Sequence, residues 1–380
     1  MTAAGRQKRS RAMKKNIAII GASYLQLPLI RKAKDMGYCT HVFAWAANDV
    51  GEKEADYFYP ISIVEKDEIL EKCREIGICG ICSISSDLAV ITVNYVGNAL
   101  GLTCNTMEST EKSTNKHLMR RAFEENGDPS PKSILVDADT DLSGIEISYP
   151  AIVKPTDRSG SRGIYKITSA DQMKEAVEGA LTQSLEKKAL IEEFAEGTEY
   201  SVEYISYEGK HTFLAVTKKY TTGAPHFIET GHLEPAPVTE EETARIKEVV
   251  EHALDTLEVK YGASHSEIKI DDEGKIRIIE IGARMGGDCI GSDLVRYSTG
   301  YDFVRMVIQI ACGEAPDFTK VCEPIAVESI FIFNREDLDE FERIRDTEPE
   351  RILQVVDMDP ELMGKATDSS TRAGCYIRRA

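Results

Sequence analysis

The stretch SHSEIKIDDEGKIRIIEIGARMGGD, residues 264–288, contains two apolar strands separated by a tight turn at residues 271–274. Glu267 lies on the first strand and Glu280 on the second, so pairing of the strands would place the two carboxylates side by side. Two carboxylates that face one space repel each other unless a cation lies between them. Magnesium is commonly held by one or two carboxylates plus phosphates, so the pair predicts a magnesium site. An exposed strand face is the alternative interpretation, which the apolar residues beside each glutamate disfavour.

A lysine followed by small residues lies upstream, in YPAIVKPTDRSGSRG (149–163). Lys154 ends a predicted strand and supplies a point charge suited to a polyphosphate. The small residues after it would let backbone N–H groups approach phosphate oxygens. These small residues are Ser159, Gly160, Ser161 and Gly163. On its own, such a loop is often only a turn.

An acidic segment, LIEEFAEGTEYSVE (190–203), follows a further apolar strand. Carboxylates at a strand end can accept hydrogen bonds from the amino group of adenine and from ribose hydroxyls. Taken alone, such residues would more often form a solvated loop. Each of the three segments is unspecific on its own, whereas their combination is specific.

The order, spacing and residue types of these segments together resemble the ATP-grasp superfamily, over nearly all of the chain from Lys14. The closest likeness is to the amino-acid (dipeptide) ligases. The implied fold combines α/β and α+β parts. An N-terminal doubly wound parallel sheet resembles the domain that precedes the ATP-grasp domain in the biotin carboxylase and phosphoribosylglycinamide synthetase branch. The resemblance implies a domain at 13–110, an ATP-grasp domain at 111–315 with a lid subdomain at about 148–196, and a small β-rich domain at 316–380.

The resemblance also implies a set of nucleotide-binding residues. Lys116 matches the first ATP lysine and Lys154 the second. The phosphate loop matches Ser159, Gly160, Ser161 and Gly163. The adenine hinge matches Glu192, Glu193 and Phe194, and the ribose-binding acid matches Glu199. Backbone groups of residues 193 and 194 are expected to contact the base.

Further residues are implied for the metal and for catalysis. Glu267 and Glu280 match the ligands of Mg²⁺ or Mn²⁺, and Arg284 matches the arginine that steadies the acyl phosphate and the tetrahedral intermediate. His232, in ETGHLEPAP, lies where amino-acid ligases tend to place substrate-contacting residues. The family usually has asparagine where this chain has Gly282, and a water or a bidentate Glu280 would then complete the metal site. An asparagine restored at position 282 is expected to be tolerated if there is room for it.

The activity implied is that of an ATP- and Mg²⁺-dependent ligase. It would activate a small-molecule carboxylate as an acyl phosphate, release ADP and couple the acyl group to an amine, as an amino-acid ligase does. A carboxylase or a purine-biosynthesis-type ligase of the same fold is an alternative. A nucleotide-binding regulatory protein without turnover is an alternative of another class, which the retained pair Glu267 and Glu280 disfavours.

The N-terminal region predicts strands at residues 16–21, 39–44 and 77–83 alternating with helices, which is typical of a parallel sheet. The turn GASYLQLP lacks G-x-G-x-x-G, so an NAD-dependent enzyme is disfavoured. SISSD (83–87) ends a strand, where such sheets bind ligands, and it is equally well explained as a helix N-cap. Further helices are predicted at residues 111–126 and 301–312.

Composition excludes some classes of protein. The 380 residues carry a formal net charge of −18, which disfavours nucleic-acid binding. No apolar run reaches the roughly 18 residues of a membrane helix.

Residues 1–12 are expected to form a disordered tail before a natural start at Met13. The nine cysteines, including the pair Cys79 and Cys82, are interpreted as reduced thiols of a cytoplasmic protein rather than as a redox or zinc motif. The sequence leaves open whether the chain forms a homodimer.

Overall fold

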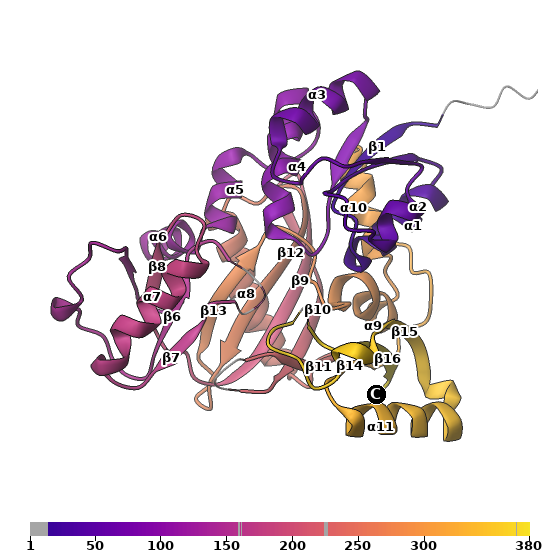
Figure 1. The fold of residues 1–380 in the computed structure, drawn as a ribbon. Coiled ribbons are helices and arrows are strands. Elements are labelled where there is room, and N and C mark those ends of the chain that lie inside the picture. The colour runs from indigo at the N-terminus through magenta and orange to yellow at the C-terminus, as the bar shows by residue number, and fades with distance from the viewer. Residues whose placement is uncertain (1–13, 159, 161, 224–226, 370) are drawn as a thin grey trace, which may run out of the picture.

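The structure is a computed structural model that describes residues 14–158, 160, 162–223, 227–369 and 371–380. The tail predicted at 1–12 lies outside the described residues, as do Ser159 and Ser161 of the predicted phosphate loop. Figure 1 shows a parallel-sheet domain at the top, a small sheet at the left and a large sheet in the centre that continues into the C-terminal strands.

The N-terminal domain is the predicted parallel sheet, with strand order β3-β2-β1-β4. Its strands are β1 (Asn16–Ile20), β2 (Cys39–Phe43), β3 (Tyr57–Tyr59) and β4 (Gly80–Cys82). Its helices are α1 (Leu27–Asp35), α2 (Val50–Glu54), α3 (Lys66–Ile76) and α4 (Asp87–Leu100). Side chains of α1 share a core with one face of the sheet, and those of α3 and α4 share a core with the other. The sheet is therefore doubly wound.

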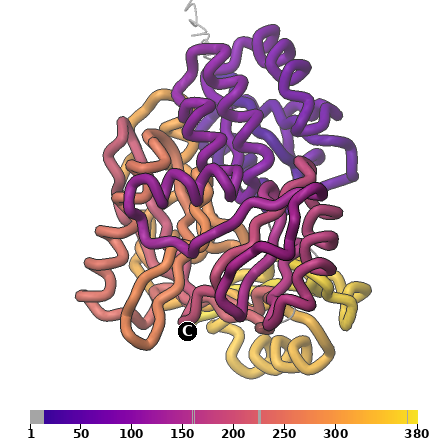
Figure 2. The backbone as a smooth tube through the Cα atoms, turned by 90° about the vertical axis from the view of Figure 1, so that its left-hand side faces the viewer, coloured from indigo at the N-terminus to yellow at the C-terminus, as the bar shows by residue number. Residues whose placement is uncertain are grey.

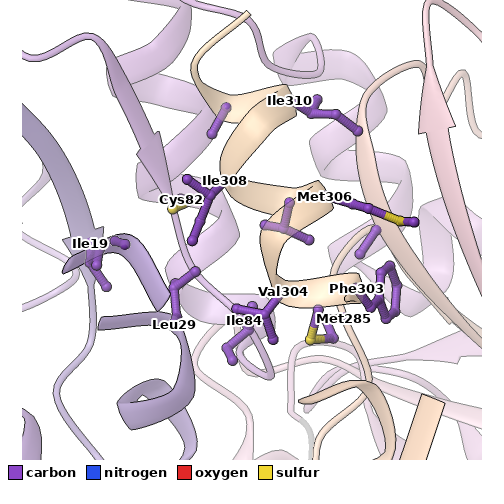
Figure 3. Close-up of a cluster of buried hydrophobic side chains, with 14 of the residues drawn as sticks. Ile19, Leu29, Cys82, Ile84, Met285, Phe303, Val304, Met306, Ile308 and Ile310 are labelled. Atoms are coloured by element: carbon purple, nitrogen blue, oxygen red, sulfur yellow. The ribbon is translucent and has the colours of Figure 1, made fainter. Parts of the chain in front are cut away.

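Helix α10 (Phe303–Ala311) joins this domain to the rest of the chain, although it lies far away in the sequence. Every residue of the helix except Arg305 is buried, and seven of its nine residues are apolar. Val304 and Ile308 pack near Leu29 of α1, and the other side of the helix faces the large sheet (Figure 3). The two parts of the chain thus share one core.

The helix predicted at residues 111–126 is two helices, which corrects that prediction. Helix α5 (Met107–Thr114) ends before Asn115, and α6 (Lys116–Asn126) begins directly after it. The Asn115 side chain accepts hydrogen bonds from the N–H groups of His117 and Leu118 and so caps α6. The break places Lys116 in the first turn of a helix.

The small sheet has strand order β5-β8-β6-β7 and is antiparallel. Its strands are β5 (Ser133–Val136), β6 (Ala151–Pro155), β7 (Tyr165–Ile167) and β8 (Ala189–Glu193), and α7 (Met173–Gln183) packs on it. Because β5 belongs to this sheet, the sheet begins earlier in the chain than residue 148. The tube in Figure 2 shows the small sheet and the large sheet below the indigo N-terminal domain.

The large sheet is antiparallel, with strand order β13-β12-β9-β10-β11-β14-β16-β15. The strands are β9 (Thr198–Tyr207), β10 (Lys210–Thr221), β11 (Glu229–Glu234), β12 (Gly262–Ile270), β13 (Ile276–Gly282), β14 (Val327–Ile332), β15 (Ile352–Met358) and β16 (Gly374–Arg379). The remaining helices are α8 (Glu240–Thr256), α9 (Val295–Thr299) and α11 (Arg335–Thr347). The hairpin turn predicted at residues 271–274 is present between β12 and β13. The C-terminal strands β14, β15 and β16 extend this sheet and do not form one of their own.

The cysteines are all free, and no disulfide occurs in the described part of the chain. Of the pair noted in the sequence, Cys82 is buried and Cys79 is partly exposed, with its Sγ 3.8 Å from Sγ of Cys312. Within the described ranges, no helix combines the length and the apolar character needed to cross a bilayer.

Asn115→Ala should destabilise the chain by about 1 kcal/mol, because it leaves two N–H groups at the start of α6 without their acceptor. Thermal unfolding should show a midpoint lowered by roughly 2–4 °C. Asn115→Ser, which keeps a capping oxygen, should recover most of the loss. Equal midpoints for Asn115→Ala and the unsubstituted chain would show that the cap contributes nothing.

Candidate active site

A cavity lies between the small sheet and the β12–β13 end of the large sheet, and it collects most of the predicted site residues. The predicted residues in its lining are Lys116, Lys154, Gly160, Glu192, Glu193, Phe194, Glu199, Glu267, Glu280 and Arg284. We call it the nucleotide cavity. Gly163 and His232 do not line it. These residues come from segments far apart in the sequence, and the fold brings them together.

Glu267 and Glu280 are direct partners across β12 and β13, as predicted from the sequence. Lys219 Nζ lies 2.6 Å from Glu267 Oε1, and Lys116 Nζ lies 2.9 Å from Glu280 Oε1. Each carboxylate is therefore balanced by its own lysine. Among the described residues, no group of three or more His, Cys, Asp or Glu side chains is arranged to hold a metal by itself. Magnesium in proteins is commonly held by one or two carboxylates together with phosphate oxygens, and this pair is a donor set of that kind.

Lys219, on β10, is a residue that the sequence analysis missed. It is buried, and its Nζ also lies 2.9 Å from Glu199 Oε1 and 3.6 Å from Glu229 Oε1. Burial alone would lower the pKa of Lys219, but the three carboxylates outweigh it and raise the pKa well above its ordinary value. The period of two along a strand places Lys219 on the same face as Ala215 and Thr217, but residues of both faces of β10 are buried, so this pattern gave no clear signal in the sequence.

Lys154 lies at the end of β6, one residue before its last residue Pro155, and it forms a buried cluster with two other charged residues. Its Nζ lies 2.6 Å from Glu192 Oε2, and Arg120 Nε of α6 lies 2.8 Å from Glu192 Oε1. Burial opposes ionisation of Glu192, but Arg120 and Lys154 more than offset it, so the pKa of Glu192 is lowered. The Glu192 side chain is therefore engaged with these two cations. Arg120 was not identified from the sequence.

Lys116 connects the loop after β6 to the metal strand. Its backbone N–H donates to the carbonyl of Thr156, and its Nζ donates to the carbonyl of Arg158 at 2.7 Å as well as to Glu280. Phe194 lines the same cavity, with Lys166 Nζ 3.6 Å and Lys269 Nζ 4.9 Å from its ring centre. The predicted contacts of Phe194 and Glu193 with adenine stay predictions.

Arg284 is held by the N-terminal domain. Its guanidinium donates to both carboxylate oxygens of Asp87, at 2.8 and 3.1 Å. Burial alone would lower the pKa of Arg284, and Asp87 more than reverses this. Ser85 donates its N–H to the carbonyl of Met285 and its hydroxyl to the carbonyl of Gly286. The SISSD segment therefore fixes the loop that carries Arg284.

The N-cap interpretation of SISSD is confirmed, since Ser86 accepts from the N–H of Ala89 at the start of α4. Ser85 and Asp87 also line a second cavity beside the first, together with His232 and Arg284. His232 is buried on β11, and its Nε2 lies 3.8 Å from Asp288 Oδ2. The structure thus places His232 near the second cavity, separate from the nucleotide cavity.

The structure leaves little room beside Gly282. Asparagine was expected to be tolerated at this position only if there were room for it, and that condition is not met. A Cβ atom at Gly282 would lie 2.8 Å from Asp87 Oδ1 and 3.0 Å from Arg284 Nε. The ion pair between Asp87 and Arg284 therefore occupies the space that a larger side chain would need.

Comparison with known proteins agrees with this geometry. Residues 147–293 match the family model described as an ATP-grasp domain. The chain contains an ATP-grasp domain. This confirms the resemblance to the ATP-grasp superfamily that the sequence motifs indicated, and the strand arrangement described above is that of the ATP-grasp fold.

Individual relatives extend the comparison beyond the ATP-grasp domain. The chain is 24% identical to alanine–anticapsin ligase of Bacillus subtilis over 353 residues, which is 83% of this chain and 74% of that protein. It is 23% identical to carnosine synthase 1 of Homo sapiens over 335 residues, 80% of this chain and 40% of that protein. The crystal structure of L-amino acid ligase from Bacillus licheniformis superimposes with a TM-score of 0.80 at 22% identity, covering 96% of this chain and 93% of that one. Several curated relatives are matched over only about half of their length.

Gly282→Asn should disrupt the contact between Asp87 and Arg284, because the new Cβ atom would overlap both side chains. Overpacking of this kind costs about 1–3 kcal/mol, so thermal unfolding should show a lowered midpoint. Gly144→Asn is the matched control, since no atom lies within 4 Å of a Cβ atom at that position. A Gly282→Asn variant as stable as the Gly144→Asn variant would contradict this account of the site.

Proposed function

We propose that this chain is an ADP-forming carboxylate–amine ligase that uses ATP and Mg²⁺, and that it acts on amino acids. The observation that carries the proposal is the facing pair Glu267 and Glu280, each balanced by a lysine in a cavity lined by Lys154. A protein that only bound nucleotide would not need a second cavity against the same wall. Arg284 lies in that wall and lines both cavities.

The residues present fit the nucleotide and the metal. Glu267 and Glu280 would hold Mg²⁺ together with phosphate oxygens, and the bound metal would neutralise charge on the transferring phosphoryl group. Lys116 and Lys154 would contact phosphate oxygens, since ammonium groups form strong charge-assisted hydrogen bonds to phosphate. The smaller residues of the phosphate loop, with Gly160 described at the cavity wall, would let backbone N–H groups approach.

The reaction has two steps. An oxygen of the substrate carboxylate attacks the γ-phosphorus of ATP, and ADP leaves with the electron pair of the broken P–O bond. The amine nitrogen then attacks the acyl carbon, the C–O bond to phosphate breaks, and the proton lost from nitrogen ends on the released phosphate. Arg284, oriented by Asp87, stabilises the charge that develops on the acyl phosphate and on the tetrahedral intermediate. Positioning and charge neutralisation supply the catalysis.

Amino-acid substrates are supported by two comparisons. Alanine–anticapsin ligase aligns over most of this chain, and the L-amino acid ligase structure superimposes over nearly all of it. His232 lines the second cavity and would lie beside a substrate bound there. A carboxylase or a purine-type ligase of the same fold would instead require bicarbonate or a ribonucleotide.

The direct test incubates the protein with ATP, Mg²⁺ and all pairs of the proteinogenic amino acids, and measures ADP, phosphate and the mass of the product. We expect ADP and phosphate in equal amounts together with a dipeptide. Two parallel reactions contain bicarbonate in place of the amino acids, or no added substrate. Release of AMP and pyrophosphate would overturn the mechanism, and turnover with bicarbonate alone would favour the carboxylase.

Glu280→Gln should lower turnover far more than it lowers affinity for ATP. The side chain keeps its size but loses the charge that would hold the metal at the transferring phosphate. The rate should fall at least about a hundredfold, a barrier change of roughly 2.7 kcal/mol. Glu273→Gln, in the exposed turn of the same hairpin, is the matched control and should have no effect. Near-normal turnover of Glu280→Gln would remove Glu280 from the metal site.

A further inference from the structure

The second cavity lies where the N-terminal domain, the Arg284 loop and the C-terminal segment meet. Its volume is about 380 Å³, in the range of small-molecule sites. The loops after β1 and β4 supply Tyr24 and Ser85, so the cavity lies at the carboxyl ends of parallel strands, where such sheets bind ligands. It shares Arg284, Lys219 and Glu267 with the nucleotide cavity. A substrate in the second cavity would therefore lie next to the transferring phosphate.

Asp288 presents a carboxylate to this cavity. Arg372 donates one guanidinium N–H to each of its oxygens, at 3.0 and 2.5 Å, and also lies 3.6 Å from the ring centre of Phe331. Burial opposes ionisation of Asp288, but Arg372 holds its pKa well below the ordinary range. The Asp288 side chain keeps 20% of its surface exposed, against 5% for that of Arg372. The anion, rather than the cation that supports it, is therefore the group accessible to a ligand.

His232 is an independent indication of a ligand. Its side chain is completely buried and lines the cavity, and neither ring nitrogen has a hydrogen-bond partner among the described residues. A buried polar group without a partner costs about 1–3 kcal/mol, so natural structures rarely retain one without a reason. Its Nε2 lies 3.8 Å from Asp288 Oδ2, beyond hydrogen-bond range.

The backbone at Asp288 is unusual as well. Asp288 and Cys289 have φ values of 51° and 66°, in the left-handed region that few non-glycine residues adopt. A π-helical turn, Ile290–Leu294, follows directly. Such conformations cost free energy and concentrate at functional sites. The chain therefore adopts a costly conformation at the residue that carries the accessible carboxylate.

We propose that Asp288 binds the α-ammonium group of the amino acid whose carboxylate is activated, and so selects zwitterionic amino acids over plain carboxylic acids. This inference rests on the proposed ligase function. Asp288 and Arg284 lie on one loop and line one cavity, so they offer an anion for the ammonium group and a cation for the carboxylate. Arg372 donates one N–H to each oxygen of Asp288, and a carboxylate oxygen can accept a second hydrogen bond, so Asp288 can also accept from a ligand in the cavity. The ammonium group stays protonated, because it takes no part in bond formation.

The experiment separates activation from coupling by using hydroxylamine, which traps an acyl phosphate as a hydroxamate without an amine substrate. The twenty proteinogenic L-amino acids are each supplied with ATP, Mg²⁺ and hydroxylamine. The best of them is then compared with its des-amino analogue and its N-acetyl derivative. We expect kcat/KM for hydroxamate formation to be roughly tenfold to a hundredfold higher for the amino acid, the value of a charge-assisted contact.

Asp288→Asn should lower kcat/KM for the amino acid to nearly that of the des-amino analogue, and should leave the rate with the analogue within about twofold. Asp288→Glu should keep the preference. Asp317→Asn is the matched control, because Asp317 is partly exposed and also pairs with an arginine but lies outside both cavities. Calorimetry should show unchanged affinity for ATP with Mg²⁺ in all three variants.

The outcomes distinguish the two proposals. Absence of hydroxamate with every acid would count against the ligase function itself. Equal hydroxamate formation from the amino acid and its des-amino analogue by the unsubstituted protein would overturn the role of Asp288, and this comparison needs no variant to fold. A preference that persists unchanged in Asp288→Asn would place the ammonium site elsewhere.

Discussion

The architecture of the site depends on the electrostatic cost of two carboxylates that face each other across one strand pair. Cβ atoms of directly opposed residues in an antiparallel pair lie about 5 Å apart, so two such charges repel by about 3 kcal/mol at an effective dielectric constant near 20. Glu267 and Glu280 are such a pair. Lys219 from β10 and Lys116 from α6 each approach one carboxylate. The break between α5 and α6 is the local feature that lets Lys116 do so.

The N-terminal domain is part of the active site and not only attached to it. Asp87 fixes the guanidinium of Arg284, and Ser85 bonds two consecutive carbonyl groups of the same loop. Helix α10 holds the N-terminal domain against the large sheet, because its side chains share a core with β4 and with the large sheet. The absence of a side chain at Gly282 follows from this arrangement, since Asp87 and Arg284 fill the adjacent space. The departure from the usual family pattern therefore has a steric cause within this chain.

The sequence predicts well what depends on local pattern. The period of two in β12 and β13 and the turn between them were enough to pair Glu267 with Glu280, and the alternation of strands and helices was enough for the parallel sheet. The features that could not be predicted depend on contacts between residues far apart in the chain. Asp87 and Arg284 are 197 residues apart, and Asp288 and Arg372 are 84 residues apart. The C-terminal strands join the large sheet through β11 and β14 for the same reason, because no local signal identifies a pairing partner.

The lysine–glutamate pairs also limit the electrostatic cost of the highly charged cavity. Removing one partner of a buried ion pair leaves an uncompensated charge that costs several kcal/mol, so each charge in the cavity needs a partner in every state. In the structure, Glu267 and Glu280 are balanced by Lys219 and Lys116. When ATP arrives with its metal, we expect the carboxylates to exchange their lysine partners for the metal, and Lys116 to exchange its carboxylate for phosphate. Lys219 can stay charged through this exchange, because Glu199 and Glu229 remain beside it. Glu199 and Glu229 therefore give Lys219 a carboxylate partner both before and after Glu267 turns to the metal.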